Sequence, residues 1–349
     1  MTDARAKKLE DFLAQEAGQP DLAVKEFREL VAGWSRLTYL ATIETAAEPG
    51  PQRLVIQVEK ADGLVVDSSV ARDIQVLRVL AAAGLPVARA LWYGADPAIL
   101  GGPFMVTEFL QGRSFDTSNA EHRAVLRDHW QQRSALPSAI VNALVGVHAC
   151  PLHGLSFLPS AASGEATAVY ELERCRTLAH EARVKDEPIV ALAFHWLERH
   201  RPETGSLTLV HGDFHMRNLL IDGERVSGIV DWEVARLSNP LFDLAYMSIP
   251  YLSGKFFAAG SDLVGGLLPQ DWLLGEYERR TGRQASDADF LFWRILATLN
   301  LLLVVAKGVS DFEAGTLTSI RNAWARFSEP VLHEDILNLL VPSDRTAAA

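Results

Sequence analysis

The sequence has little cysteine: only Cys150 and Cys175 occur among its 349 residues. Two isolated cysteines form neither a disulfide framework nor the paired spacing of a zinc site. The first residues, Met-Thr-Asp-Ala-Arg-Ala-Lys-Lys, lack the apolar segment of a signal peptide. Together these two absences predict a protein of the reducing cytoplasm.

Long apolar runs and long basic runs are also missing. The most apolar stretch, residues 295–306, is interrupted by Asn300, and it is shorter than the roughly twenty residues that a membrane-spanning helix requires. We therefore expect a buried helix there. The net charge is -11 with no basic cluster, which argues against nucleic acid or an anionic membrane surface as the partner.

What the chain does have is enough length and apolar content for a large core. Hydrophobic residues make up 48% of a 349-residue chain. Chains of this length exceed most single domains, so two lobes are expected.

Patterning separates the chain into a β-rich first third and a helical remainder. Alternating or β-branched segments predict antiparallel strands over residues 26–31, 37–44, 53–59, 88–93 and 104–109. A first helix over residues 3–15 is followed by one that Ser68 or Ser69 caps and Gly84 closes. Later helices are expected over residues 122–132, 137–148, 170–180, 189–200, 271–280 and 289–305. This α+β pattern predicts domains over residues 1–110 and 111–349.

One polar loop stands out, His211-Gly-Asp-Phe-His-Met-Arg-Asn218. Apolar segments flank it, and an Asp222-Gly223 turn then predicts a hairpin, with the chain beyond it mainly helical. Asp213 and Asn218 are five residues apart, and Asp231 lies thirteen further on. Because a hairpin brings its two ends together, these oxygen-bearing side chains can converge. Such a set suits a phosphoryl transfer, with one carboxylate for the acceptor and hard oxygens for magnesium.

The motifs around this loop resemble those of a known family. His-Gly-Asp-x-His-x-x-Asn, then Ile-Val-Asp-Trp-Glu and Pro240-Leu-Phe-Asp-Leu-Ala, are similar to motifs of the aminoglycoside phosphotransferase (choline kinase-like) family. Residues 80–87 and 96–113 resemble the subgroup of kinase-like domains fused to acyl-CoA dehydrogenases. The resemblance implies a bilobal protein kinase-like fold: an antiparallel-sheet lobe with one main helix, and a larger, mainly helical lobe.

It also implies an activity. Members of this family use ATP, with GTP as an alternative donor, and Mg²⁺ to phosphorylate a hydroxyl group of a small molecule. Their acceptors are aminoglycosides, choline, sugars and amino alcohols, and the fused relatives suggest hydroxyacyl thioesters. The sequence leaves the acceptor and the oligomeric state open.

Residue roles follow from the motif positions. The resemblance makes Asp213 the catalytic base and Asn218 and Asp231 the magnesium ligands. His211 and Asp243 fall where side chains brace the catalytic loop. The family's nucleotide-binding positions correspond to Gly33 and Ser35 on a phosphate-covering turn and to Glu108 and Leu110 where the backbone binds adenine.

Two further residues have open roles. His215 is either a substrate contact or a structural histidine. Glu233 either faces a cationic acceptor or caps a following helix.

The sequence departs from the family at one position. The strand that normally carries a phosphate-binding Lys or Arg has Gln57 in that slot, and its helix partner is Asp73 rather than Glu. An amide adds no charge, so the transferring group would be less stabilised. Arg53 and Arg36 are the candidate replacements; Arg53 lies about 13 Å along the strand from Gln57, and Arg36 is better placed. The departure also allows a catalytically weak or inactive nucleotide-binding protein.

A metal-dependent hydrolase is the remaining alternative. His211, Asp213, His215 and Asp231 form a His-x-Asp-x-His pattern with one more carboxylate, which can bind a transition metal. The other histidines lack ligand spacing, so this alternative is the weaker one.

Overall fold

The computed structural model describes residues 4–30, 35–47, 50–60, 69–256 and 263–341. The chain divides into two compact units, Met1–Gln111 and Gly112–Ala349. Each is described separately below.

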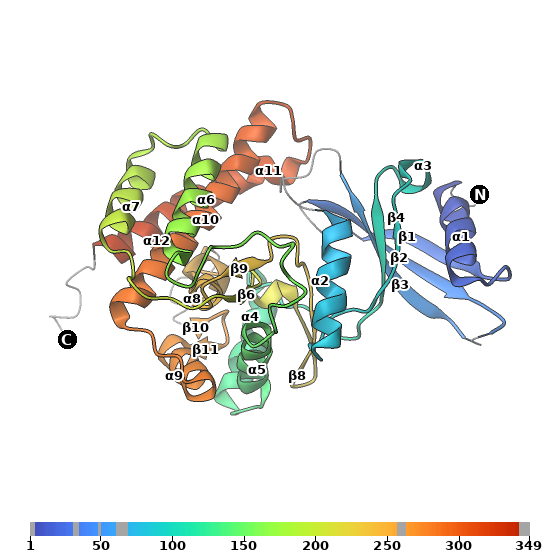
Figure 1. Ribbon diagram of the computed structural model, residues 1–349, viewed down its shortest axis with the longest axis horizontal. Helices are drawn as coiled ribbons and strands as arrows, with labels where there is room; N and C mark the ends of the chain where they lie inside the picture. The colour runs from blue at the N-terminus through green and yellow to red at the C-terminus, as the bar shows by residue number, and fades with distance from the viewer. Residues whose placement is uncertain (1–3, 31–34, 48–49, 61–68, 257–262, 342–349) are drawn as a thin grey trace. The chain divides into compact units, whose positions relative to one another are not determined.

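The first unit is an antiparallel sheet with a helix on each face (Figure 1). Its helices are α1 (Ala4–Ala17), α2 (Val70–Ala82) and the short α3 (Pro97–Leu100). Its strands are β1 (Ala23–Leu30), β2 (Arg36–Glu44), β3 (Gln52–Glu59), β4 (Ala90–Gly94) and β5 (Phe104–Glu108), in the order β1-β2-β3-β5-β4. The expected meander of strands is therefore present.

The alternating side chains of the sheet divide it into two faces. Leu54, Ile56 and Val58 of β3 are buried in a core that also contains Leu9 and Leu13 of α1. Because successive side chains of a strand point to opposite faces, the residues between them, including Gln57, point to the other face. On that side Glu59 Oε1 accepts a hydrogen bond of 2.7 Å from the backbone N–H of Val70, the first residue of α2.

The serine expected to cap α2 does not bond the helix through its side chain. Ser69 occupies the N-cap position but makes no capping hydrogen bond with its hydroxyl, and Ser68 lies outside the described residues. The Glu59 carboxylate instead satisfies a free N–H of the first turn.

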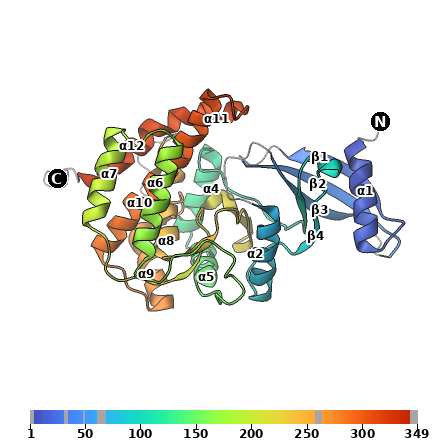
Figure 2. The same ribbon diagram turned by 45° about the horizontal axis from the view of Figure 1, so that its top comes forward.

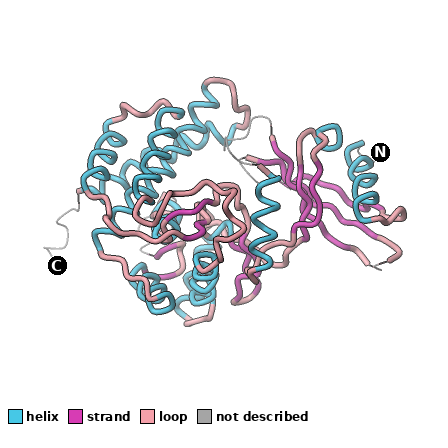
Figure 3. Tube along the Cα trace, viewed as in Figure 1, coloured by secondary structure: helices cyan, strands magenta, loops and turns pink. Residues whose placement is uncertain are grey.

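The second unit is mainly helical (Figure 3). Its α-helices are α4 (Ala120–Gln131), α5 (Leu136–His148), α6 (Thr167–Glu181), α7 (Pro188–Arg199), α8 (Leu241–Met247), α9 (Gln270–Thr281), α10 (Asp287–Glu313), α11 (Ile320–Ala325) and α12 (Glu329–Leu340). Its 3-10 helices are η1 (Met216–Asn218), η2 (Pro250–Ser253) and η3 (Arg326–Ser328).

The described residues of this unit also form three two-stranded sheets. They pair β6 (Thr208–Val210) with β9 (Arg236–Ser238), β7 (Leu219–Asp222) with β8 (Arg225–Ile229), and β10 (Leu263–Val264) with β11 (Leu268–Pro269). The β7–β8 hairpin was expected. The expectation that the chain beyond this hairpin is mainly helical misses β9, β10 and β11, which have three residues or fewer and so show no readable alternation.

Helix α10 is the central helix of the second unit, and α6, α7, α8, α11 and α12 all contact it (Figure 2). Ser286 caps it by accepting a hydrogen bond from Asp289 N, and Asp287 and Asp289 add negative charge to its first turn. Among the described helices it alone has the length and apolar composition to cross a membrane, and 61% of its most apolar window is buried. Its apolar residues fill the core of the unit, as the sequence predicts for residues 295–306.

Candidate active site

The polar loop is held between two pairs of strands in the second unit. Strand β6 ends immediately before His211, η1 ends the loop at Asn218, and the hairpin begins at Leu219. At the open end of the hairpin, Val230 N donates a hydrogen bond of 3.0 Å to Asn218 O. The residue after Val230 is Asp231, so pairing of the hairpin brings the backbone of Asp231 beside Asn218.

Asp213 and Asn218 meet directly. Asn218 Nδ2 donates to Asp213 Oδ2 at 2.7 Å and to Asp213 O at 2.9 Å. Because both acceptors are oxygens, the nitrogen of the amide must face Asp213. Its other atom, Oδ1, accepts no hydrogen bond from any described residue. An amide oxygen held in this way is a suitable ligand for a hard cation.

Asp231 has an unusual backbone conformation. Its φ is 69°, in the left-handed region that few residues other than glycine adopt. Aspartate tolerates this region better than most residues, and such conformations occur at functional sites. Asn218 and Asp231 together provide an amide oxygen and a carboxylate, a donor set that fits Mg²⁺.

The environment of Asp213 keeps its carboxyl group ionised. Burial by itself raises the pKa, but the charge of His215 and hydrogen bonds from His215 and Tyr246 outweigh burial and lower the pKa to about 2. The side chain of Asp213 is still 28% exposed, and His215 Nε2 lies 3.4 Å from its Oδ1. An ionised carboxylate with partial access to solvent can therefore accept a hydrogen bond from the hydroxyl group of a ligand at neutral pH.

Both ring nitrogens of His211 are hydrogen-bonded. Nε2 lies 3.0 Å from Val230 O, and Nδ1 accepts a hydrogen bond of 3.2 Å from Asp213 N. These partners fix the neutral tautomer with the proton on Nε2. Burial lowers the pKa of His211, in agreement with a neutral ring.

This geometry argues against the transition-metal alternative. Neither nitrogen of His211 is available as a ligand, and the described residues contain no group of three His, Cys, Asp or Glu side chains arranged to hold a metal ion.

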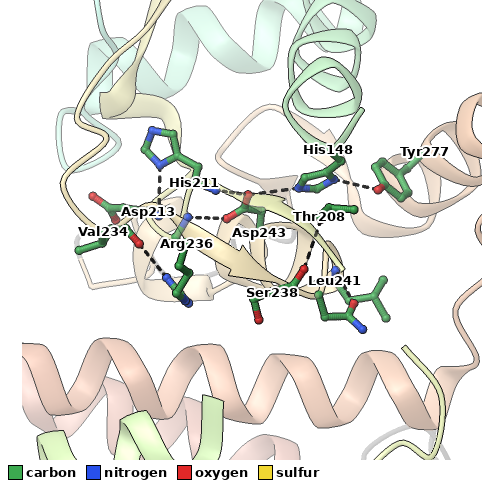
Figure 4. A network of polar contacts seen from close by, with 12 residues as sticks. His148, Thr208, His211, Asp213, Val234, Arg236, Ser238, Leu241, Asp243 and Tyr277 are labelled. Carbon is green, nitrogen blue, oxygen red and sulfur yellow. Dashed lines mark hydrogen bonds and ion pairs between the residues drawn. The ribbon is translucent and has the colours of Figure 1, made fainter. Parts of the chain in front are cut away.

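Asp243 of α8 holds the start of the loop. Its Oδ2 accepts a hydrogen bond from His211 N and its Oδ1 one from Gly212 N, both at 2.8 Å. His148 Nε2 lies 3.2 Å from Oδ2, and His148 Nδ1 lies 2.8 Å from Tyr277 Oη. Figure 4 shows this chain of contacts, which links α5, α8 and α9 to the loop. Asp243 thus fixes two consecutive peptide groups just before Asp213.

A buried ion pair lies beneath the same loop. Arg236 Nε and Nη2 bind Glu171 Oε1 and Oε2 at 2.6 and 3.1 Å, and both side chains are almost fully buried. Gly212 packs over this arginine at a φ of 85°, where an added Cβ would lie 2.3 Å from Arg236 Nη1 and 2.8 Å from Val234 O. The glycine of the motif is therefore required by space as well as by backbone conformation.

The two residues with open roles are placed differently. His215 contacts Asp213 directly and lies near the ring of Tyr246. Glu233 lies in a turn that strand β9 follows, so no helix begins there for it to cap. The capping interpretation of Glu233 is wrong, and the acceptor interpretation stays a prediction.

In the first unit, the structure joins two predicted residues. Arg36 Nη1 and Asp73 Oδ2 are 2.6 Å apart, and both side chains are buried. Gln57 is half-buried on the face of β3 that lies toward α2. The other candidate cation, Arg53, stacks on the ring of Phe109 at 3.9 Å.

The remaining predicted nucleotide-binding residues line the ends of strands. Ser35 is buried just before β2, while Gly33 lies outside the described residues. The Glu108 carboxylate and N–H both bond the backbone of Arg89. Leu110 follows β5, and its N–H donates no hydrogen bond to the described residues.

Sequence reasoning missed three residues of the site: Tyr246, Glu171 and Arg236. Tyr246 lies one helical turn after Asp243 on α8, and this i, i+3 spacing could have placed it on the same side of the helix. Glu171 and Arg236 are 65 residues apart, and no local signal joins them.

Comparisons with known proteins agree with the motif resemblance. Residues 26–301 match the profile of the phosphotransferase enzyme family. The "Probable acyl-CoA dehydrogenase IBR3" of Arabidopsis thaliana is 29% identical over 75% of this chain and 33% of its own length. "Acyl-CoA dehydrogenase family member 11" of Pongo abelii is 26% identical over 87% of this chain and 39% of its own length. The match thus spans only between 33% and 39% of the length of these relatives.

Solved structures share the fold. A protein of Ralstonia eutropha JMP134 that bears the name of an aminoglycoside phosphotransferase has a TM-score of 0.72 at 21% identity, covering 95% of this chain and 97% of its own. A mutant of aminoglycoside phosphotransferase APH(4)-Ia, in complex with ADP and hygromycin B, has a TM-score of 0.59 at 17% identity, covering 94% and 98%. The expected bilobal kinase-like fold is confirmed.

Proposed function

Because the chain belongs to the phosphotransferase enzyme family, we propose that it transfers the γ-phosphate of ATP to a hydroxyl group of a small molecule, with Mg²⁺. The hydrogen bond from Asn218 Nδ2 to Asp213 Oδ2 carries this proposal. It joins the residue that would receive the acceptor to a residue that would hold the metal.

Asp213 orients the acceptor hydroxyl. With a pKa of about 2 the carboxylate is ionised at neutral pH and accepts a hydrogen bond from that hydroxyl. A carboxylate with such a low pKa is a weak base. Its main contribution is therefore to align the oxygen of the acceptor hydroxyl with the phosphorus atom. The new P–O bond forms as the bond to the ADP oxygen breaks, and the hydroxyl proton leaves towards Asp213.

Asn218 and Asp231 would hold magnesium, which neutralises charge on the phosphate groups. The amide oxygen of Asn218 is directed by its own N–H donors, which are both bound to Asp213. Asn218, the proposed metal ligand, and Asp213, which would bind the hydroxyl group of the substrate, therefore position one another.

The first unit would bind the nucleotide. The expected contacts are the backbone at Glu108 and Leu110 for adenine and the segment of Gly33 and Ser35 for the phosphates. The N–H of Leu110 supports the first of these roles, because it makes no hydrogen bond among the described residues.

The acceptor class has two sources of support. The APH(4)-Ia structure was solved with hygromycin B, and the longer relatives carry the name of acyl-CoA dehydrogenases. We therefore propose a hydroxylated small molecule, with aminoglycosides and hydroxyacyl thioesters as the first classes to test. His215 and Glu233 are the proposed contacts for that acceptor.

A library experiment tests this function. Purified protein is incubated with MgATP and a panel of aminoglycosides, choline, sugars, amino alcohols and hydroxyacyl thioesters, and mass spectrometry records addition of a phosphate group. We expect at least one acceptor to be phosphorylated by the wild type and not by Asp213→Asn. Binding of MgATP without transfer to any acceptor would favour the alternative of a non-catalytic nucleotide-binding protein, which Gln57 suggests.

A further inference from the structure

The first unit contains a buried cation in an unexpected strand. Arg36 opens β2, and its Nη1 lies 2.6 Å from Oδ2 of Asp73 in the first turn of α2. The two side chains are only 5% and 2% exposed. The family pattern instead predicts a cation on β3, at the position of Gln57.

Strand register shows that these two positions are neighbours. Thr38 of β2 is paired with Gln57 of β3, and Arg36 is paired with Glu59. Paired residues of antiparallel strands share one face, and diagonal neighbours lie about 7 to 8 Å apart. Arg36 therefore occupies the same face as Gln57, one strand away and two residues displaced. A long side chain can reach the same space from either position.

The face in question is the one next to α2. The alternate residues Leu54, Ile56 and Val58 belong to the opposite core. Glu59, which is paired with Arg36, bonds the first N–H of α2. The Glu59 contact fixes the start of the helix, and thereby the height at which Asp73 meets Arg36.

A buried ion pair of this kind is poor evidence for a purely stabilising role. Removing two charges from water costs much of what their attraction returns, and apolar replacements are often as stable. Asp73 Oδ1 is also buried without a hydrogen-bond partner among the described residues, with Arg72 Nε at 3.7 Å. The pair therefore leaves one buried carboxylate oxygen without a hydrogen bond among the described residues, which favours a functional role for the cation over a purely stabilising one.

We infer that Arg36 is the phosphate-binding cation of this protein, supplied from β2 in place of β3 and held in position by Asp73. The inference rests on the proposed function. A guanidinium group presents its N–H donors in a planar fork that matches the oxygens of a phosphate group. Arg36 would contact the phosphate groups, while Asp73 acts through Arg36 as a positioning residue. The amide of Gln57 then leaves room for the arginine without adding a second charge.

Nucleotide binding separates this role from a structural one. The affinity of Arg36→Gln for MgATP is compared with its affinity for adenosine by calorimetry. A phosphate-binding role predicts an affinity for MgATP that is lower by about 100-fold, which lies in the upper part of the range for losing a hydrogen bond between charged groups. The affinity for adenosine stays within about twofold, because adenosine has no phosphate group. Arg28→Gln is the matched control: it removes an exposed arginine of β1 that bonds Glu26, and it leaves both affinities unchanged.

Moving the cation tests the position itself. The double variant Arg36→Gln, Gln57→Arg keeps the composition and returns the arginine to β3, and we expect it to recover at least a tenth of the wild-type affinity for MgATP. If Arg36→Gln does not fold, Arg36→Gln with Asp73→Asn removes both charges of the pair, and the inference requires the same selective loss of MgATP affinity.

The possible failures are distinct. Wild-type affinity for MgATP in a folded Arg36→Gln variant would overturn the inference and leave the proposed function standing. Equal losses for MgATP and adenosine would also overturn it, because they indicate structural damage. A wild type that binds no nucleotide would overturn both.

Discussion

Asn218 and Asp213 fix one another: two hydrogen bonds, of 2.7 and 2.9 Å, run from the Asn218 amide to the side chain and the backbone oxygen of Asp213. Each residue therefore depends on the other for its orientation. The loop presents one carboxylate and one amide oxygen in a fixed relation before any ligand arrives. Preorganisation of this kind lowers the cost of aligning reactants.

We expect Asp213→Asn to abolish phosphate transfer but not nucleotide binding. An amide of the same size can still accept the hydrogen bond from Asn218, but it lacks the second carboxylate oxygen that aligns the hydroxyl and takes its proton, so kcat falls by about 100-fold to 10000-fold. Steady-state kinetics and calorimetry with MgATP measure the two effects. The control is Asp116→Asn, which removes an exposed carboxylate bound to Arg217 of the same loop. A variant that keeps more than a tenth of wild-type kcat would contradict the role of Asp213.

We expect Asp243→Asn to lower kcat, although Asp243 has no proposed contact with a substrate. The Asp243 carboxylate accepts hydrogen bonds from two backbone N–H groups, those of His211 and Gly212. An asparagine has only one oxygen, so one N–H would face an NH₂ group. We expect the free energy of unfolding to fall by about 1 to 3 kcal/mol and kcat to fall by about tenfold or more, because the loop before Asp213 shifts.

Urea unfolding and kinetics on the same preparation measure both quantities for Asp243→Asn. Asp222→Asn is the control, because its carboxylate bonds Arg225 on the exposed hairpin turn. Loss of stability with an unchanged kcat would show that Asp243 supports only the fold.

Parts of this site follow from local sequence and parts do not. The Asp222-Gly223 turn and its flanking apolar residues predict the hairpin, and the hairpin predicts that Asn218 and Asp231 approach one another. The family pattern has a cation at position 57, and the proposal that Arg36 replaces it rests on the pairing of Arg36 with Glu59. The spacing of residues in the sequence does not determine this register. The sequence alone favours Arg36 over Arg53 only through the distance of Arg53 from position 57, and it does not show that Arg36 shares a face with Gln57. Strands β6 and β9 are too short for alternation to be recognised.

The Glu171–Arg236 pair gives the largest expected effect on stability. Both side chains are buried, so Glu171→Gln leaves a guanidinium without its charge partner. We expect the free energy of unfolding to fall by about 3 to 5 kcal/mol. The exposed pair of Arg176 with Glu198 provides the comparison, since Glu198→Gln should cost less than about 1 kcal/mol. Similar losses in the two variants, measured by urea unfolding, would contradict the importance of burial.

His211 should make stability depend on pH in the range below neutrality. In the folded chain burial lowers the pKa of the ring, and Nδ1 must stay unprotonated to accept the N–H of Asp213. The unfolded chain, with a His pKa of about 6.5, therefore binds more protons than the folded chain below that pH. Stability is then greatest above about pH 6.5 and declines as the pH falls, by at most about 1.4 kcal/mol per pH unit for one group.

The variant His211→Gln isolates this contribution, because an amide does not titrate. Its amide nitrogen can still donate to Val230 O, as Nε2 of the ring does. We expect the difference in unfolding free energy between wild type and His211→Gln to shrink between pH 7 and pH 5, as the wild type alone loses the contribution of the neutral ring. Urea unfolding at each pH measures this difference. A constant difference over the range would mean that the ring titrates alike in the folded and unfolded chains, and Nδ1 would then not be the acceptor that orients Asp213.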